Sequence, residues 1–194
     1  MKYVVALGNP GPEYAKTRHN VGWLCADILI AKLGFSELVF NAKYQARISS
    51  GEIAGESVMI LYPDTYMNHS GVVTKKLGLQ NPSAELIVLQ DEVDLPLGEI
   101  KLSSGRGHGG HNGIRSIVEH LGTKDFARMR IGISPTSFFT GKIKRPQGEK
   151  LPKFVLGKFT SKEEKVVGEI GLQVSSALEV WVKHGLPMAM NKFN

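Results

Sequence analysis

The sequence uses cysteine only once in 194 residues, at Cys25. A single cysteine cannot form an internal disulfide, and such sparing use suits a reducing compartment. Cys25 lies within an apolar run, which favours a small buried side chain over a reactive thiol. We therefore expect a cytoplasmic protein that folds without disulfides.

Long apolar runs are also missing. None reaches the roughly 18 residues that a membrane-spanning helix needs, so no membrane partner is expected. The N-terminal run MKYVVALGNPG breaks at Gly8, which is too early for a signal peptide and fits a first strand. With 194 residues and ordinary shares of apolar (42%) and charged (22%) residues, the chain predicts a single domain over 1–194.

Several signatures of catalytic and nucleotide-binding sites are absent. The sequence contains no G-x-S-x-G pattern, which disfavours an α/β-hydrolase serine, and no G-x-x-x-x-G-K-[ST] pattern, which disfavours a P-loop NTPase. It also contains no C-x-x-C pair and no H-E-x-x-H zinc motif. Gly105, Gly107 and Gly110 do satisfy G-x-G-x-x-G. The strand expected before them is short and polar, and no second apolar strand delivers an acid at the usual distance, so dinucleotide binding is the less favoured alternative.

What the sequence does contain is an alternation of short β-type runs and helical patterns. Asn20 is a candidate N-cap and Gly34 a stop for one helix, and Ser161 opens a long last helix. The interleaving predicts an α/β fold: one globular domain with a mixed, mostly parallel central sheet flanked by helices. Residues 134–153 lack periodicity and predict a mobile loop. Strands are expected at 3–7, 44–48, 58–62, 86–89, 100–102 and 127–133, and helices at 21–33, 65–77 and 114–121 and from 161.

Polar residues gather at the ends of these elements, at 9–20, 90–94 and 103–112. Sites in open α/β sheets form where strands end. Among these residues, His19 can take a proton from water near neutral pH, and a carboxylate such as Asp91 can orient the ring and stabilise the imidazolium. Amides can donate to a developing oxyanion or hold a water; the candidates are Asn9, Asn68 and Asn112. These residue types indicate water-mediated hydrolysis of an activated acyl bond.

Structural roles remain open for the same residues. Each Asn also suits a turn or a cap, and His19 taken alone also suits a hydrogen-bonded structural role. His108 and His111 form an H-x-x-H pair, with His19 and His69 as further candidates for a zinc site. Because that pair lies in a glycine-rich loop with no adjacent carboxylate, we favour the interpretation without a metal.

The net charge of +6 indicates an anionic partner. Basic residues fall into two groups, one within the 134–153 segment and one around the glycine-rich segment. A solvated surface is the alternative for the first group. The groups are Lys142, Lys144, Arg145, Lys150 and Lys153, and Lys101, Arg106, Arg115, Arg128 and Arg130.

Four segments taken in order resemble the bacterial-type peptidyl-tRNA hydrolase family over essentially the whole chain. They are GNPGPEYAKTRHNVGW at 8–23, TYMNHSG at 65–71, QDEVDLPLG at 90–98 and GGHNGIRSI at 109–117. The resemblance implies a monomeric, cytoplasmic α/β enzyme without metal or cofactor. It also implies cleavage of the ester between a peptide and the 3′ ribose of tRNA, with peptidyl-tRNA as the partner.

The resemblance further implies roles for individual residues. His19 matches the catalytic base and Asp91 its partner. Side chains around peptide and water would be Asn9, Tyr14, Met67, Asn68 and Asn112, and tRNA phosphates would meet Lys101, Arg106, Arg130 and Lys142. The segment 134–153 resembles a mobile cover over the cleft. A module of this fold that binds RNA without cutting it is the main alternative, and a nucleotide-dependent enzyme is the second.

Overall fold

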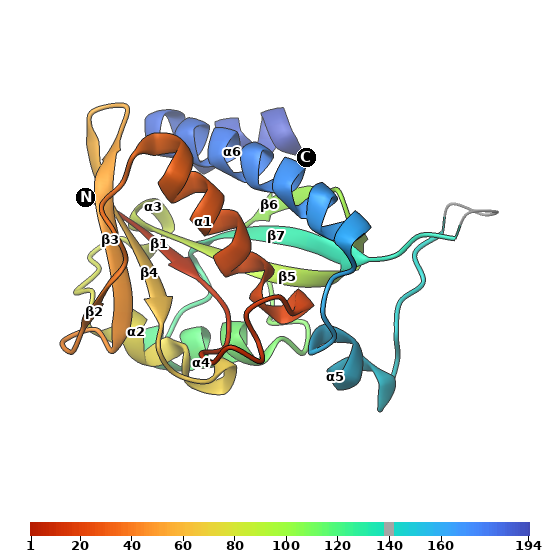
Figure 1. The fold of residues 1–194 in the computed structure, drawn as a ribbon. Helices are drawn as coiled ribbons and strands as arrows, with labels where there is room; N and C mark the ends of the chain where they lie inside the picture. Colours follow the sequence, from red (N-terminus) through yellow and green to blue (C-terminus); the bar gives the residue numbers. More distant parts are fainter. Residues whose placement is uncertain (138–141) are drawn as a thin grey trace.

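Seven strands form one sheet in the order β2-β3-β4-β1-β5-β7-β6 in the computed structural model, which describes residues 1–137 and 142–194 (Figure 1). The four central strands, β4, β1, β5 and β7, run parallel, whereas β2, β3 and β6 pair antiparallel to their neighbours. The predicted mixed, mostly parallel sheet is therefore confirmed. The strands are β1 (Lys2–Ala6), β2 (Val39–Asn41), β3 (Ala46–Ile53), β4 (Glu56–Pro63), β5 (Leu86–Pro96), β6 (Ile100–Ser103) and β7 (Ala127–Ser134).

Helices cover both faces of this sheet and bury a core on each (Figure 1). The long helices α1 and α6 pack on one face through residues such as Leu29 and Val174. The shorter helices α2 and α4 pack on the other through Val73 and Ile114. The α-helices are α1 (Val21–Leu33), α2 (Gly71–Lys75), α3 (Pro82–Glu85), α4 (Asn112–Leu121), α5 (Lys150–Val155) and α6 (Ser161–Phe193), and the 3-10 helices are η1 (Arg18–Asn20) and η2 (Met67–His69).

Helix α1 has the predicted bounds, and Cys25 is fully buried in it as expected. Gly34 ends the helix in the left-handed conformation, with φ +64°. Asn20 occupies the N-cap position of α1, as predicted, but its side chain makes no capping bond. It instead binds the backbone of Asn9.

The helix predicted over 65–77 is wrong at its N-terminal end. Tertiary hydrogen bonds replace helical ones there: the Met67 N–H donates to Asn9 Oδ1 at 2.8 Å and the Gly71 N–H to Ser116 Oγ at 3.0 Å. Residues 67–69 form η2, and α2 starts only at Gly71.

The segment 134–153 contains more hydrogen-bonded structure than the predicted loop. The Ser137 N–H donates to the Lys142 carbonyl and the Lys144 N–H to the Pro135 carbonyl, so the two arms of the segment pair. Helix α5 begins within it, at Lys150. Residues 138–141 lie outside the described residues, and the mobility of the segment stays a prediction.

Helix α6 crosses the whole sheet and returns the chain to the edge strand β6. Its helical path is broken at Gly185, where φ is +81°. Beyond it, the Asn194 side chain bonds both backbone groups of Leu102, with Oδ1 accepting from the N–H at 2.7 Å and Nδ2 donating to the carbonyl at 3.0 Å. In the part of the chain that the structure describes, no helix is long and apolar enough to cross a membrane.

Candidate active site

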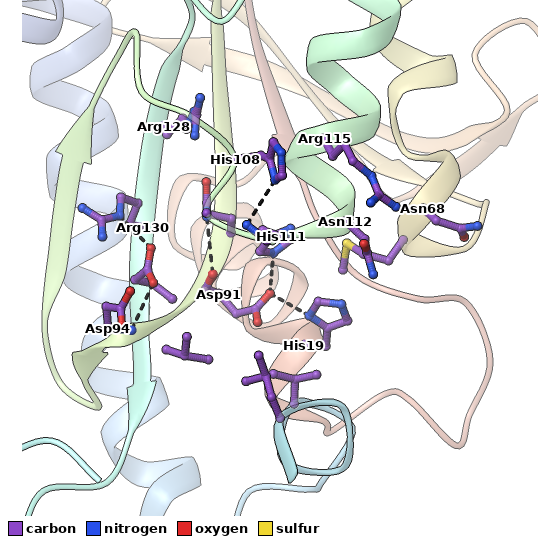
Figure 2. A pocket seen from close by; sticks show the side chains of 18 of the residues that line it. His19, Asn68, Asp91, Asp94, His108, His111, Asn112, Arg115, Arg128 and Arg130 are labelled. Atoms are coloured by element: carbon purple, nitrogen blue, oxygen red, sulfur yellow. Dashed lines mark hydrogen bonds and ion pairs between the residues drawn. The ribbon is translucent and has the colours of Figure 1, made fainter. Parts of the chain in front are cut away.

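A cavity of about 980 Å³ opens at the carboxyl edge of the parallel strands (Figure 2). Strands β1 and β5 are neighbours, and the Leu7 N–H donates to the Leu89 carbonyl at 3.0 Å just where β1 ends. This register brings Asn9, after β1, and Asp91, in β5, to the same edge of the sheet. Side chains from η1, η2, α5, the start of α4 and the glycine-rich segment complete the lining.

Asp91 is buried and joins two histidines through one oxygen. Its Oδ1 lies 2.8 Å from His19 Nδ1 and 2.8 Å from His111 Nε2, as the dashed lines in Figure 2 show. The predicted proximity of His19 and Asp91 is thus observed. Strand β5 extends past Leu89, where the sequence predicted its end, because Asp91 continues the ladder opposite Ile131 of β7.

His111 is the N-cap of α4, and this role fixes its tautomer. Its Nδ1 accepts the N–H groups of Gly113 at 3.1 Å and Ile114 at 3.4 Å. Because Nδ1 is an acceptor, a neutral His111 carries its proton on Nε2 and donates it to Asp91. Gly109 and Gly110, with φ +59° and +83°, provide the left-handed backbone that turns the chain into this cap.

His19 uses the opposite tautomer. Its Nδ1–H donates to Asp91, which leaves the Nε2 lone pair free to accept a proton. Burial favours the neutral ring, but the adjacent Asp91 charge and hydrogen bond outweigh it and raise the pKa of His19. Burial likewise opposes ionisation of Asp91, yet the two imidazoles hold the pKa of Asp91 far below its ordinary value. The site therefore combines an ionised carboxylate with a strengthened base.

His19, Asp91 and His111 are the one group of possible metal ligands found in residues 1–137 and 142–194. The H-x-x-H interpretation pairs His111 with His108, but His108 Nδ1 accepts the Gly110 N–H and belongs to no such group. A metal needs lone pairs from its ligands. His111 Nε2 and His19 Nδ1 both present protons to Asp91, so the donor set as arranged does not fit a metal.

Asn9 is held rigidly beside these residues. Asn20, itself fully buried, accepts the Asn9 N–H at 2.9 Å and donates to its carbonyl at 3.0 Å. The Asn9 Oδ1 accepts the Met67 N–H at 2.8 Å. Because Oδ1 is engaged, Asn9 presents its NH2 group as the remaining donor.

The other predicted site residues divide into two sets. Met67, Asn68, Asn112, Arg106 and Arg130 line the cavity with His19, Asp91 and Asn9. Tyr14 does not line it, but packs edge-to-face on Tyr66, which does, with ring centroids 6.5 Å apart. Lys101 lies in a smaller adjoining hollow that Arg106 and Arg130 share. Lys142 is exposed and is not among the described residues that line either hollow.

The basic residues near the cavity are less available than the sequence implies. Arg130 pairs with Glu92 at 2.8 Å, and Arg145 pairs with Asp94 at 2.9 Å. Arg128 is buried and donates to the carbonyls of Arg106 and Gly107. Burial, followed by the charge of Arg130, lowers the pKa of Arg128. Arg128 therefore holds the glycine-rich segment in place through these two carbonyls.

Two features of the cavity were not predicted from the sequence: the role of His111, and the helix α5 in its apolar wall. His111 was considered only as a metal ligand, although its place beside Asn112 in GGHNG was a usable signal. The apolar wall from α5, with Leu151, Val155 and Leu156, lies in and just beyond a segment predicted to be a loop.

Comparison with known proteins assigns the chain to a family. The sequence model described as Peptidyl-tRNA hydrolase matches residues 3–194. The chain belongs to this family. A peptidyl-tRNA hydrolase from Syntrophotalea carbinolica is 43% identical over 199 residues, covering 100% of this chain and 97% of the relative. One from Mycobacterium avium is 44% identical over 192 residues, covering 97% and 95%.

Solved structures agree with this assignment. The crystal structure of peptidyl-tRNA hydrolase from Acinetobacter baumannii matches with a TM-score of 0.86 and 36% identity, covering 100% of this chain and 94% of that one. The chain is thus a member of a family of enzymes with this fold. The dinucleotide alternative also fails on topology, because the strand before Gly105 is the antiparallel edge strand β6 rather than a parallel strand of a βαβ unit.

Proposed function

We propose that this protein hydrolyses the ester bond between the peptide and the 3′ ribose of peptidyl-tRNA, which returns the tRNA for reuse. Membership of the peptidyl-tRNA hydrolase family supports the substrate. The observation that carries the chemistry is the 2.8 Å contact of His19 Nδ1 with Asp91, which leaves His19 Nε2 as a base beside the cavity.

In this mechanism His19 Nε2 takes a proton from a water as the water oxygen attacks the ester carbonyl. Asp91 stabilises the imidazolium that forms. The carbonyl oxygen becomes an oxyanion, for which the amide N–H groups of Asn9, Asn68 and Asn112 are the candidate donors. When the C–O bond breaks, the ribose oxygen leaves with the proton that His19 returns. General-base help of this kind contributes about 10²–10⁴-fold.

Selectivity for peptidyl-tRNA over aminoacyl-tRNA is assigned to the same amides. A peptide bond in the substrate can form hydrogen bonds with Asn68 and Asn112. Aminoacyl-tRNA has no peptide bond, so it leaves these two amides unpaired, which weakens binding once water is excluded. Met67, which is buried at the cavity wall, supplies an apolar contact to the peptide. Tyr14 acts at the rim through Tyr66 to seat the 3′ end.

The tRNA backbone is proposed to lie over Lys101, Arg106 and Arg130, with Lys142 meeting it further along. The first three residues share one hollow beside the cavity, which supports a joint role. We further propose that the protein acts in the cytoplasm, where translation produces its substrate, and that it does so as a monomer without a cofactor.

The test is single-turnover hydrolysis of purified N-acetyl-aminoacyl-tRNA, with and without chelator. We expect release of free tRNA in both conditions and a loss of at least about 100-fold in His19→Ala. Wild-type protein that binds the substrate but never releases tRNA would support the RNA-binding alternative. A His19→Ala variant as fast as wild type would remove the proposed base.

A further inference from the structure

The residues just before His19 are bound to a segment more than 130 positions away. The Arg18 N–H donates to the Gly157 carbonyl at 3.0 Å, and the Phe159 N–H donates to the Lys16 carbonyl at 3.0 Å. Thr17 and Lys158 form an antiparallel β-bridge between these bonds. The turn that carries His19 is therefore joined to the linker between α5 and α6.

The Arg18 side chain reinforces this junction. Its guanidinium carbon lies 4.7 Å from the ring centre of Phe154 and 5.3 Å from that of Phe159. Nη2 donates to both carboxylate oxygens of Glu163 at 3.0 Å, and Nη1 donates to the Lys158 carbonyl at 2.9 Å. Only 12% of the Arg18 side chain is exposed.

Glu163 is itself fixed from the other side. Its Oε2 accepts the Thr160 N–H at 2.7 Å, and Thr160 Oγ1 accepts the Glu163 N–H at 3.3 Å, which together form a capping box at the start of α6. The carboxylate that binds Arg18 is thus anchored to the longest helix of the fold. Arg18 consequently links three parts of the molecule, namely η1, α5 and α6.

This link joins the base to a wall of the cavity. Phe154, which stacks on Arg18, belongs to α5, and its neighbour Val155 lines the same cavity as His19. Any movement of Arg18 would therefore shift the base and the apolar wall together.

Stability alone is a poor explanation for Arg18. The Arg18 Nε is buried without a hydrogen-bond partner, which is a cost. A largely buried ion pair is often replaceable by apolar side chains without loss of stability. The planar Arg18 guanidinium, held between two aromatic rings and a carboxylate, instead fixes the orientation of the backbone at Arg18. The neighbouring His19 imidazole needs such a fixed orientation.

We infer that Arg18 is a positioning residue, which through Glu163 and Phe154 holds His19 against Asp91 and α5 against the cavity. The inference rests on the proposed role of His19 as the base. A displacement of about 1 Å at a reacting group can cost about 100-fold in rate. Disruption of the link should therefore appear in kcat rather than in substrate affinity.

The deciding variant is Glu163→Gln, because glutamine can still complete the capping box while losing the charge that holds Arg18. Glu164→Gln is the matched control: it neutralises the next residue, which pairs with Lys16 at 3.1 Å between the same two segments. We expect kcat to fall about 10- to 100-fold in Glu163→Gln with little change in KM. Glu164→Gln should stay within about twofold of wild type, as exposed ion pairs contribute little.

The pH profile supplies a readout that a structural role would not move. If His19 loosens from Asp91, its pKa falls toward the ordinary value, so the acid limb of kcat/KM moves to lower pH in Glu163→Gln and in Arg18→Met. Arg18→Lys keeps the positive charge, so its kcat should lie between those of Arg18→Met and wild type. If Glu163→Gln matches Glu164→Gln in both kcat and acid limb, the inference is overturned, even if its stability falls. His19→Ala separates the two proposals, because an active His19→Ala overturns the proposed base itself.

Discussion

Asp91 Oδ1 accepts protons from two histidines whose other nitrogens do different things. His111 Nδ1 accepts backbone N–H groups at the start of α4, whereas no described residue hydrogen-bonds to His19 Nε2, and His19 lines the cavity. One imidazole is thus a fixed donor and the other a free base. The division follows from backbone geometry, because only His111 has N–H groups aimed at its second nitrogen.

The pH dependence of activity should follow the ionisation of His19. The pKa of His19 is raised above its ordinary 6.5 by Asp91, so the acid limb of kcat/KM should have its midpoint above 6.5. Asp91→Asn removes the charge but keeps the shape, and burial then lowers the pKa, so the limb should move to lower pH. Rates on N-acetyl-aminoacyl-tRNA between pH 5 and 9 would show this, and identical limbs would contradict the pairing.

The same pair predicts how stability depends on pH. The raised pKa of His19 means that its contribution to the free energy of unfolding is complete below 6.5 and is lost as pH rises through the higher folded value. The lowered pKa of Asp91 means that its contribution is present above 3.8 and is lost as pH falls. Urea unfolding of wild type and Asp91→Asn should therefore differ most between about pH 4 and 6.5, and a constant difference across pH would contradict this linkage.

Substitutions of His111 distinguish its hydrogen bond to Asp91 from its capping of α4. His111→Asn keeps a good N-cap but cannot reach Asp91, whereas His111→Ala loses both functions. The asparagine variant should lose about 1.5–3 kcal/mol of unfolding free energy, as expected for a hydrogen bond to a charged group. The alanine variant should lose about 1 kcal/mol more. Equal values in urea titrations would show that the cap contributes nothing.

At this scale the sequence predicted His19, Asp91 and Asn9 because their residue types are visible in it, even though Asp91 lies within β5 rather than after its end. It did not predict His111, because the role of that residue depends on where α4 begins. The helix was expected from Ile114 but starts at Asn112, and that shift turns a loop histidine into a cap.

The side chain of Asn20 stabilises the connection between β1 and α1. The fully buried side chain satisfies both backbone groups of Asn9. Asn20→Ala should leave these two groups unpaired and cost at least about 2 kcal/mol in a urea titration. A much smaller loss in Asn20→Ala would show that the two Asn9 groups find other partners.

Helix α1 is the element that the sequence predicted best. It is a long, largely apolar run that ends at Gly34, which takes the left-handed conformation typical of a helix end. The 65–77 region differs because its N–H groups bond to Asn9 and Ser116, which are distant in sequence. Helix α5 escaped prediction because it is only six residues long and contains Pro152.

The molecule as a whole carries a net charge of +6, but the ion pairs within the protein decide which of its basic residues can bind phosphate. Affinity for tRNA should fall linearly with the logarithm of salt concentration. Lys101→Gln and Arg106→Gln should each reduce that slope by about 1. Arg130→Gln should reduce it less, because Glu92 already neutralises Arg130. A slope unchanged in all three variants would place the tRNA elsewhere.

The side chain of Asn194 makes the two edges of the sheet unequal. It occupies the outward N–H and carbonyl of Leu102 on β6, the groups that another chain would need in order to add a strand there. An incoming strand must first displace the Asn194 side chain. At the opposite edge, the short strand β2, no described side chain blocks the backbone in this way, and Val39 and Phe40 are exposed. Self-association through strand addition, when it occurs, should therefore begin at β2 and spare the β6 edge, which lies beside the hollow lined by Lys101, Arg106 and Arg130.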